Sequence, residues 1–126
     1  MAKSDNWRIE HIKDVPPKKS TYSKGWKSIR WHMGIEGFGV NGVTKSKGEW
    51  LTPIHDEVEG DQDELFYVIE GLAEFDLNGK KIAAPAGSLV SVKPTVKRGA
   101  KALKTQTTLL IIGSPIGAAY EPPDWA

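Results

Sequence analysis

Residues 64–82 read ELFYVIEGLAEFDLNGKKI and contain the strongest local folding signal of this chain. Two runs rich in aromatic and β-branched residues flank the pair Asn78-Gly79. Asn and Gly both tolerate the positive φ angles that a two-residue type I′ turn requires. The stretch therefore predicts a β-hairpin with Asn78 and Gly79 at its tip, and we expect residues 63–112 to be almost wholly strand and turn.

Similar short runs recur on both sides of this hairpin. The chain contains 13 glycines and 8 prolines, and no window has the sustained apolar spacing of a long amphipathic helix. We expect strands at residues 7–12, 27–33, 38–44, 65–70, 73–77, 81–83, 88–93 and 107–112. Many short strands without helices predict an all-β fold, either a sandwich or a barrel.

The length of 126 residues allows one domain with one core. We expect an N-terminal strand and a polar connector in residues 1–25, a barrel over about residues 26–113 and an irregular tail over residues 114–126. The tail contains Tyr120 and Trp125, and side chains of this size need a surface on which to dock.

Charge and composition exclude several classes of protein. Lys plus Arg is 17 and Asp plus Glu is 16, so no global field attracts nucleic acid or an acidic membrane. The absence of cysteine excludes disulfides, thiolate nucleophiles and Cys-ligated metals. The apolar run 109–112 is too short for a membrane helix, and the first residues lack a signal peptide. We therefore expect a cytoplasmic protein with neither a membrane nor a nucleic acid as partner.

Two motifs resemble sites of other functions. Residues 37–42, GFGVNG, fit the dinucleotide pattern G-x-G-x-x-G, but no helix follows to face a pyrophosphate. A glycine-rich strand with a bulge or a tight bend explains them better. The acidic residues 56–64 lack the order of an EF-hand loop, and a solvated loop explains them.

The order of residues between Gly48 and Gly99 resembles that of the cupin superfamily. The first motif of that family has a glycine, two histidines one residue apart, a glutamate and a further glycine. The second has Pro-x-Gly before a third histidine, and the four polar residues usually hold a divalent metal at the mouth of a β-barrel. The resemblance implies a cupin-type β-barrel, also called a double-stranded β-helix or jelly roll. The chain is also similar to small bacterial single-domain cupins, for which no reaction is settled.

The match to these motifs is incomplete. Gly48, His55, Glu64 and Gly71 fit the first motif. Glu57 stands where the second histidine is expected, and Arg98 lies nearest the position of the missing third histidine. The resemblance therefore leaves a candidate metal set of His55, Glu57 and Glu64. One nitrogen and two carboxylates bind transition metals less well than three imidazoles do. We predict no firmly held cofactor, and a divalent metal such as Mn, Fe, Zn or Ni that binds weakly or substoichiometrically.

Glu64 points into the barrel in the family pattern. A buried carboxylate needs a cation or becomes protonated, and Arg98 can supply that charge through a guanidinium. The alternative places Arg98 in solvent, and a shift of one residue in register decides between the two. If Glu64 points inward, Phe66 shares its face of the strand. We expect Phe66 and Trp50 to line an apolar pocket beside His55; the alternative is that these aromatics pack in the core or at an interface.

These residues lead to three hypotheses about function. The first is a cupin that binds a small organic ligand, acidic ones included, with His55, Glu64, Arg98, Phe66 and Trp50 in the site. The second is a metal-dependent enzyme of the dioxygenase or isomerase type that uses His55, Glu57 and Glu64. The third is a non-catalytic sensor or assembly module whose interior is filled. We also predict a homodimer, because an N-terminal strand at residues 7–12 would have an exposed edge. The sequence assigns no catalytic residue.

Overall fold

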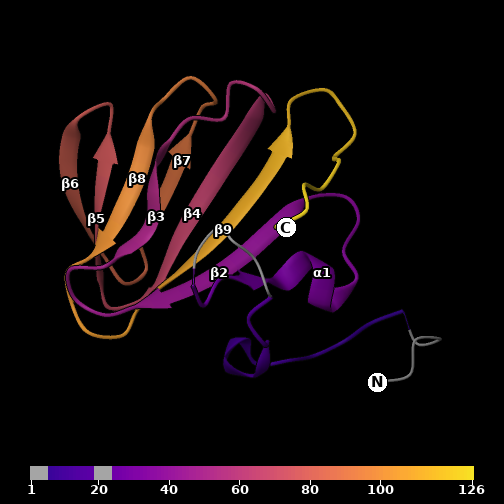
Figure 1. Ribbon diagram of the computed structural model, residues 1–126, viewed down its shortest axis with the longest axis horizontal. Coiled ribbons are helices and arrows are strands. Elements are labelled where there is room, and N and C mark those ends of the chain that lie inside the picture. Colours follow the sequence, from indigo (N-terminus) through magenta and orange to yellow (C-terminus); the bar gives the residue numbers. More distant parts are fainter. Residues whose placement is uncertain (1–5, 19–23) are drawn as a thin grey trace.

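The computed structural model describes residues 6–18 and 24–126 and consists of two antiparallel sheets (Figure 1). The larger sheet has the strand order β1-β2-β9-β4-β7, and the smaller has the order β3-β8-β5-β6. The strands are β1 (Lys27–Ser28), β2 (Gly39–Lys45), β3 (Trp50–His55), β4 (Gln62–Glu70), β5 (Leu72–Leu77), β6 (Lys80–Pro85), β7 (Leu89–Val92), β8 (Arg98–Ala102) and β9 (Thr107–Pro115). The helices are a 3-10 turn at Ile12–Asp14 and α1 (Ile29–Met33). The all-β prediction is confirmed.

The hairpin predicted from Asn78-Gly79 joins β5 to β6. Asn78 has φ 54° and Gly79 has φ 89°, as a type I′ turn requires. The side chain of Asp76 accepts a hydrogen bond of 2.8 Å from Gly79 N and closes the turn. The tip is also bonded to the segment before β8, because Asn78 N donates to Lys97 O and Lys97 N donates to Asn78 Oδ1. The turn therefore holds the start of β8 as well as its own two strands.

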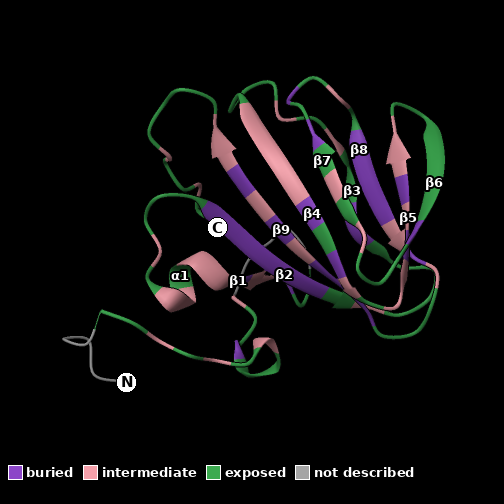
Figure 2. Ribbon diagram, turned by 180° about the vertical axis from the view of Figure 1, so that it is seen from behind, coloured by how far each residue is buried: buried purple, intermediate pink, exposed green. Residues whose placement is uncertain are grey.

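The core lies between the two sheets. Phe66 of β4 and Phe75 of β5 meet edge to face across it, with ring centroids 5.4 Å apart. The larger sheet adds Val43, Val68 and Leu109, and the smaller sheet adds Leu51, Ala73, Ala100 and Ala102. Figure 2 shows that β2 and β8 are largely buried, whereas β6 is mostly exposed. Burial alternates along β5, as expected for a strand with one face on the core, whereas β2 and β8 are covered on both faces.

Three expectations for single elements are wrong. Residues 7–12 form no strand, and they contain the start of the 3-10 turn. Residues 27–33 begin as β1 but continue as α1, because the Ser28 side chain accepts a hydrogen bond from Trp31 N and caps the helix. Strands β3 and β8 have no counterpart in the predicted strands. The β8 sequence RGAKA has low strand propensity, and it becomes a strand by pairing with β3 on one side and β5 on the other.

The N-terminal residues pack on the outer side of the larger sheet. Ile12 and Ile29 lie over Gly42 of β2, and the Glu10 carboxylate contacts both Arg8 and His32. Because residues 7–12 form no strand, the edge from which the homodimer was predicted is missing. The dimer stays a prediction, to be checked by light scattering at micromolar concentration. The N-terminal strand and polar connector were predicted over residues 1–25. Of these, residues 1–5 and 19–23 lie outside the described part of the chain.

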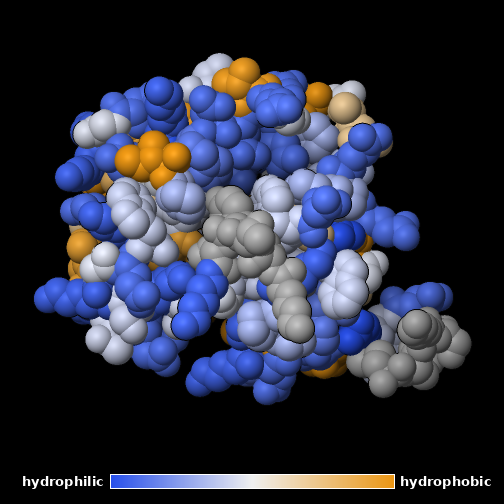
Figure 3. Space-filling model, viewed as in Figure 1, coloured by the Kyte–Doolittle hydropathy of each residue, from blue (hydrophilic) through white to orange (hydrophobic). Residues whose placement is uncertain are grey.

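The visible surface is mainly hydrophilic. In the view of Figure 3, hydrophobic residues form scattered small groups among charged and polar ones. Within residues 6–18 and 24–126, no helix combines the length and the apolar character needed to cross a membrane.

Candidate functional site

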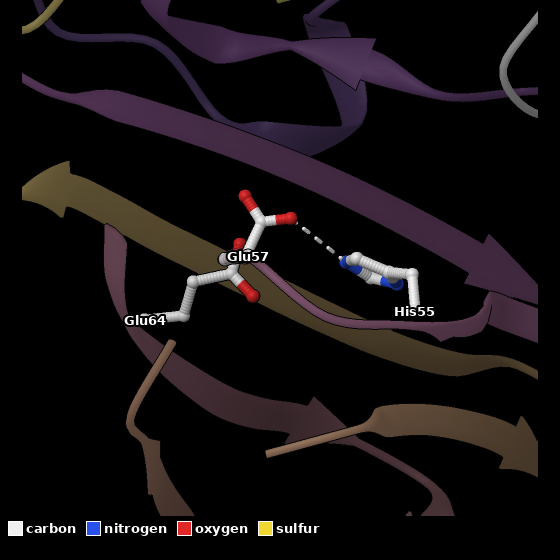
Figure 4. Close-up of side chains that lie close together, drawn as sticks. All are labelled: His55, Glu57 and Glu64. Carbon is white, nitrogen blue, oxygen red and sulfur yellow. Dashed lines mark ion pairs between the residues drawn. The ribbon is translucent and has the colours of Figure 1, made fainter. Parts of the chain in front are cut away.

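Three predicted site residues meet at one end of the two sheets. His55 ends β3, Glu64 lies in the first half of β4, and Glu57 lies in the loop between these strands. One ligand atom of each residue lies within 4.8 Å of the others, and Figure 4 shows the three side chains converging. His55 and Glu64 are nine residues apart in sequence. They lie close together because the loop after β3 returns the chain from the smaller sheet into β4 of the larger sheet.

The imidazole of His55 is held by two contacts. Its Nδ1 lies 2.8 Å from Pro53 O, so Nδ1 carries the proton and donates it to this carbonyl. Its Nε2 lies 3.3 Å from Glu57 Oε2. Burial lowers the pKa of His55, but the hydrogen bonds to Glu57 and Pro53 and the charges of Glu57 and Glu64 outweigh burial and raise it. The ring is thus oriented with Nε2 toward the carboxylates.

Glu64 is the most strongly perturbed group of the site. Burial, followed by the charge of Glu57, raises its pKa to about 7, against the smaller opposing effects of Arg98 and His55. A carboxyl that titrates near neutral pH can take up or release a proton under physiological conditions. The site therefore contains two groups, His55 and Glu64, and the charge of each favours the charged form of the other.

Arg98 faces the interior, as the first alternative predicted. Its side chain is fully buried, and Nη1 donates a hydrogen bond of 2.8 Å to Glu64 Oε1. Its Nε donates to Val96 O at 2.9 Å and its Nη2 donates to Lys93 O at 2.6 Å. Because these protein acceptors engage Arg98, its charge neutralises Glu64 and is poorly placed to meet an acidic ligand.

A small pocket of about 20 Å³ opens beside this group. A volume of this size holds about one water molecule or ion. Its lining is mixed, with polar groups on one part and aromatic or aliphatic side chains on the rest: Trp26, Asn41, Thr52, His55, Glu64, Phe66, Ile111 and Trp125. Phe66 is therefore placed as predicted, on the face of β4 that also carries Glu64.

Trp50 does not lie beside His55, which corrects its predicted place. It lies in a different hollow, with Ile54 and Asp76, and Lys101 Nζ is 4.7 Å from its ring centroid. Strand β3 shifts its register between Trp50 and Thr52 and again before His55. Simple alternation along β3 therefore fails, because each irregularity changes which side chains face the interior.

Sequence reasoning missed several residues of the pocket. Asn41 of β2 faces inward and accepts a hydrogen bond of 3.1 Å from Trp26 Nε1. Asn41 and Val43 are two residues apart and therefore share one face of the strand. A polar residue on the same face as a core valine was the sequence signal for a polar group in the interior. Trp125 comes from the tail, and its ring meets Trp26 at a centroid distance of 6.2 Å. Its need for a docking surface was recognisable, but its place at this pocket follows only from the folded chain.

The donor atoms of His55, Glu57 and Glu64 suit some divalent metals better than others. The hydrogen bond from His55 Nδ1 to Pro53 O fixes the ring so that Nε2 can face a metal, as is usual for histidines that bind metals. Two carboxylates beside one imidazole suit oxygen-preferring ions such as Mn²⁺ better than zinc. Arg98 already occupies Glu64 Oε1 and places a positive charge beside the site. The residues thus fit a weakly held divalent ion.

No protein-family model and no curated protein matches the chain. Solved structures do match it. A cupin protein from Bacteroides fragilis is 17% identical with a TM-score of 0.66, covering 85% of this chain and 91% of its own. An RmlC-like cupin from Desulfovibrio desulfuricans is 21% identical with a TM-score of 0.67, covering 87% and 100%. A sugar phosphate isomerase of the cupin superfamily from Silicibacter pomeroyi is 17% identical with a TM-score of 0.71, covering 86% and 76%. Together with the two antiparallel sheets, these similarities show that the chain has the cupin fold, the double-stranded β-helix.

Proposed function

We propose that the protein binds a small, neutral, hydroxyl-bearing organic molecule at the barrel mouth, through His55, Glu57 and Glu64. The observation that carries this proposal is the bond between Arg98 and Glu64. Because the chain itself supplies the cation that the barrel carboxylate needs, the site does not depend on a resident transition metal.

The chemistry of the pocket favours a neutral ligand over an acidic one. Glu57 and Glu64 present carboxyl oxygens, and Arg98 is engaged by protein acceptors. Hydroxyl groups can donate to these oxygens, whereas a ligand carboxylate would meet like charge. Phe66 and Trp125 offer apolar walls for the carbon skeleton.

A second candidate is a metal-dependent enzyme, favoured by the donor atoms of His55, Glu57 and Glu64 within 4.8 Å of one another. A divalent metal held there would polarise an oxygen of the ligand as a Lewis acid. In the metal-free site Glu64 has a pKa of about 7, and if His55 and Glu57 alone held the metal, Glu64 would hold or release a proton beside that ligand. Proton transfer within an isomerase-type reaction fits these residues.

Thermal-shift titration tests the proposed function. A panel of neutral sugars and polyols is compared with the matching sugar acids, with and without added Mn²⁺. We expect neutral compounds to raise the melting temperature without metal, and Glu64→Gln and His55→Ala to abolish the shift. Trp50→Ala is the matched control, because Trp50 lies in a separate hollow. Shifts from acids alone, or unchanged shifts in Glu64→Gln, would overturn the proposal. Shifts that require Mn²⁺ would favour the second candidate instead.

A further inference from the structure

The segment of residues 116–126 covers the mouth of the barrel. After β9 ends at Pro115, the chain turns back toward the start of β2 and α1 (Figure 1). Ile116 N donates to Asp61 O at 3.0 Å and begins this return. Tyr120 packs against Gly39, where an added Cβ would lie 2.7 Å from the tyrosine oxygen. The Tyr120 ring can therefore pack here only because residue 39 is a glycine without a side chain.

Two basic side chains hold the far end of this segment. Arg30 Nη2 donates to Ala126 O at 2.7 Å. Lys18 Nζ donates to Asp124 O at 2.9 Å and to Ala126 O at 3.3 Å. These contacts place Trp125 against the buried Trp26 and over the pocket that His55 and Glu64 line.

The pocket is too small for the ligand of the proposed function. It measures about 20 Å³, whereas pockets for small organic molecules are typically about 300–1,000 Å³. Six of the eight lining residues lie on β2, β3, β4 and β9 and are fixed by strand pairing. Trp26 is 2% exposed and belongs to the core. Trp125, in contrast, lies in a segment outside both sheets, and peripheral segments of this kind open at a lower free-energy cost than paired strands.

We propose that the segment 116–126 is a displaceable wall and that Trp125 determines the size of ligand admitted to the site. The inference rests on the proposed function for the nature of the ligand. When the contacts of Lys18 and Arg30 are released, the indole leaves Trp26 and the pocket gains the volume of the tryptophan side chain. The closed form then leaves His55 and Glu57 only partly exposed and restricts the pocket beside His55 and Glu64, and the open form admits the ligand.

Chemical modification of His55 tests the wall without any ligand. Diethyl pyrocarbonate acylates accessible imidazole nitrogens, and mass spectrometry of the full chain gives the rate at each histidine. We expect Trp125→Ala to raise the rate at His55 several-fold and to leave the rate at the exposed His11 unchanged. Trp50→Ala, which removes a tryptophan outside this pocket, should have no effect on either rate.

Two milder variants keep the test valid if Trp125→Ala fails to fold. Gly39→Ala pushes the Tyr120 hydroxyl away from β2. Lys18→Ala removes two contacts of the segment end, to Asp124 O and to Ala126 O, without touching the pocket. Either folded variant should also speed the modification of His55. An unchanged rate in the folded variants would overturn the inference, because the wall would then be a fixed part of the barrel. Faster modification without binding of any neutral polyol would instead contradict the proposed function and leave this inference intact.

Discussion

Arg98 Nη1 and Glu64 Oε1 lie 2.8 Å apart in the barrel interior, with 0% of the arginine side chain and 10% of the glutamate side chain exposed. The pair joins β8 of the smaller sheet to β4 of the larger one. Removing one partner of a buried ion pair leaves an uncompensated charge and strongly lowers the free energy of unfolding. Replacing the whole pair by apolar residues of similar volume has a much smaller effect. Arg98 is therefore a positioning residue for the site, since it binds Glu64 Oε1 and lowers the pKa that burial and Glu57 raise.

Removal of Arg98 should destabilise the protein in a pH-dependent way. Near pH 5 Glu64 is protonated, so Arg98→Ala loses only hydrogen bonds and packing. Above about pH 7 the wild-type Glu64 is ionised beside Arg98, whereas the variant must leave this charge unpaired or keep the carboxyl protonated at a further raised pKa, so the loss should grow with pH toward roughly 3–5 kcal/mol. Urea denaturation at both pH values measures the difference.

The double variant separates a direct interaction from two independent effects. Arg98→Ala combined with Glu64→Gln should lose less stability than the sum of the single variants, because both changes break one interaction. Additive losses that do not change with pH would show that the charge of Glu64 does not depend on Arg98.

Glu57→Gln should lower the pKa of Glu64. Glu57 is the charge that, after burial, most raises this pKa to about 7. In the wild type the raised pKa means that the contribution of Glu64 to stability is complete below about pH 4.5 and is lost as pH rises through about 7. The variant should therefore show a shallower fall of stability over that range.

Carbon-13 NMR of labelled glutamate side chains follows the same titration directly. His55 should change as well, because its bond to Glu57 raises its pKa. Both pKa values should fall in Glu57→Gln and stay unchanged in the control Glu49→Gln, whose contact is with Ser46 N. Identical Glu64 titrations in the wild type and in Glu57→Gln would contradict the proximity of the two carboxyls.

Protein purified without chelator should contain well under one equivalent of Mn, Fe, Zn or Ni. One imidazole and two carboxylates, beside the charge of Arg98, form a weak site for these ions. Arg98→His removes that charge and adds an imidazole, so its metal content should rise. Elemental analysis measures both proteins, and one tightly held metal per wild-type chain would support the enzyme hypothesis.

Gly79→Ala should destabilise the protein by about 1 kcal/mol, since residue 79 adopts φ 89° and alanine is strained there. Gly60→Ala is a suitable control, because glycine 60 has no positive φ and lies in an exposed loop. Thermal denaturation should show the difference between the variants. Equal stability would mean that the turn adapts its backbone without cost.

The parts of the fold that depend on local chemistry could be predicted from the sequence. Asn78-Gly79 specifies its turn through two backbone conformations, and alternation along β4 places Glu64 and Phe66 on one face. The need of a buried carboxylate for a cation led to Arg98. These predictions required only neighbouring residues and one electrostatic rule.

Other parts depend on contacts that no local pattern contains. The irregularities of β3 place Trp50 away from His55, and they arise from its pairing with β8. Trp125 reaches the pocket through a segment held by Arg30 and Lys18, both distant in sequence. Tertiary packing therefore decides which aromatic side chain closes the site.

The bonds between Asn78 and Lys97 have a consequence for the order in which the chain folds. The β5–β6 hairpin closes a short loop, whereas the pairing of β2 with β9 joins residues as distant as Gly39 and Gly113. Local contacts form fastest, and distant strand pairs limit the folding rate. A hairpin that forms early offers Asn78 as a fixed partner for Lys97 before the distant strands meet. Arg98, the next residue, is then delivered to the interior in the correct orientation, which reduces the number of misfolded arrangements that place its charge in the core without Glu64.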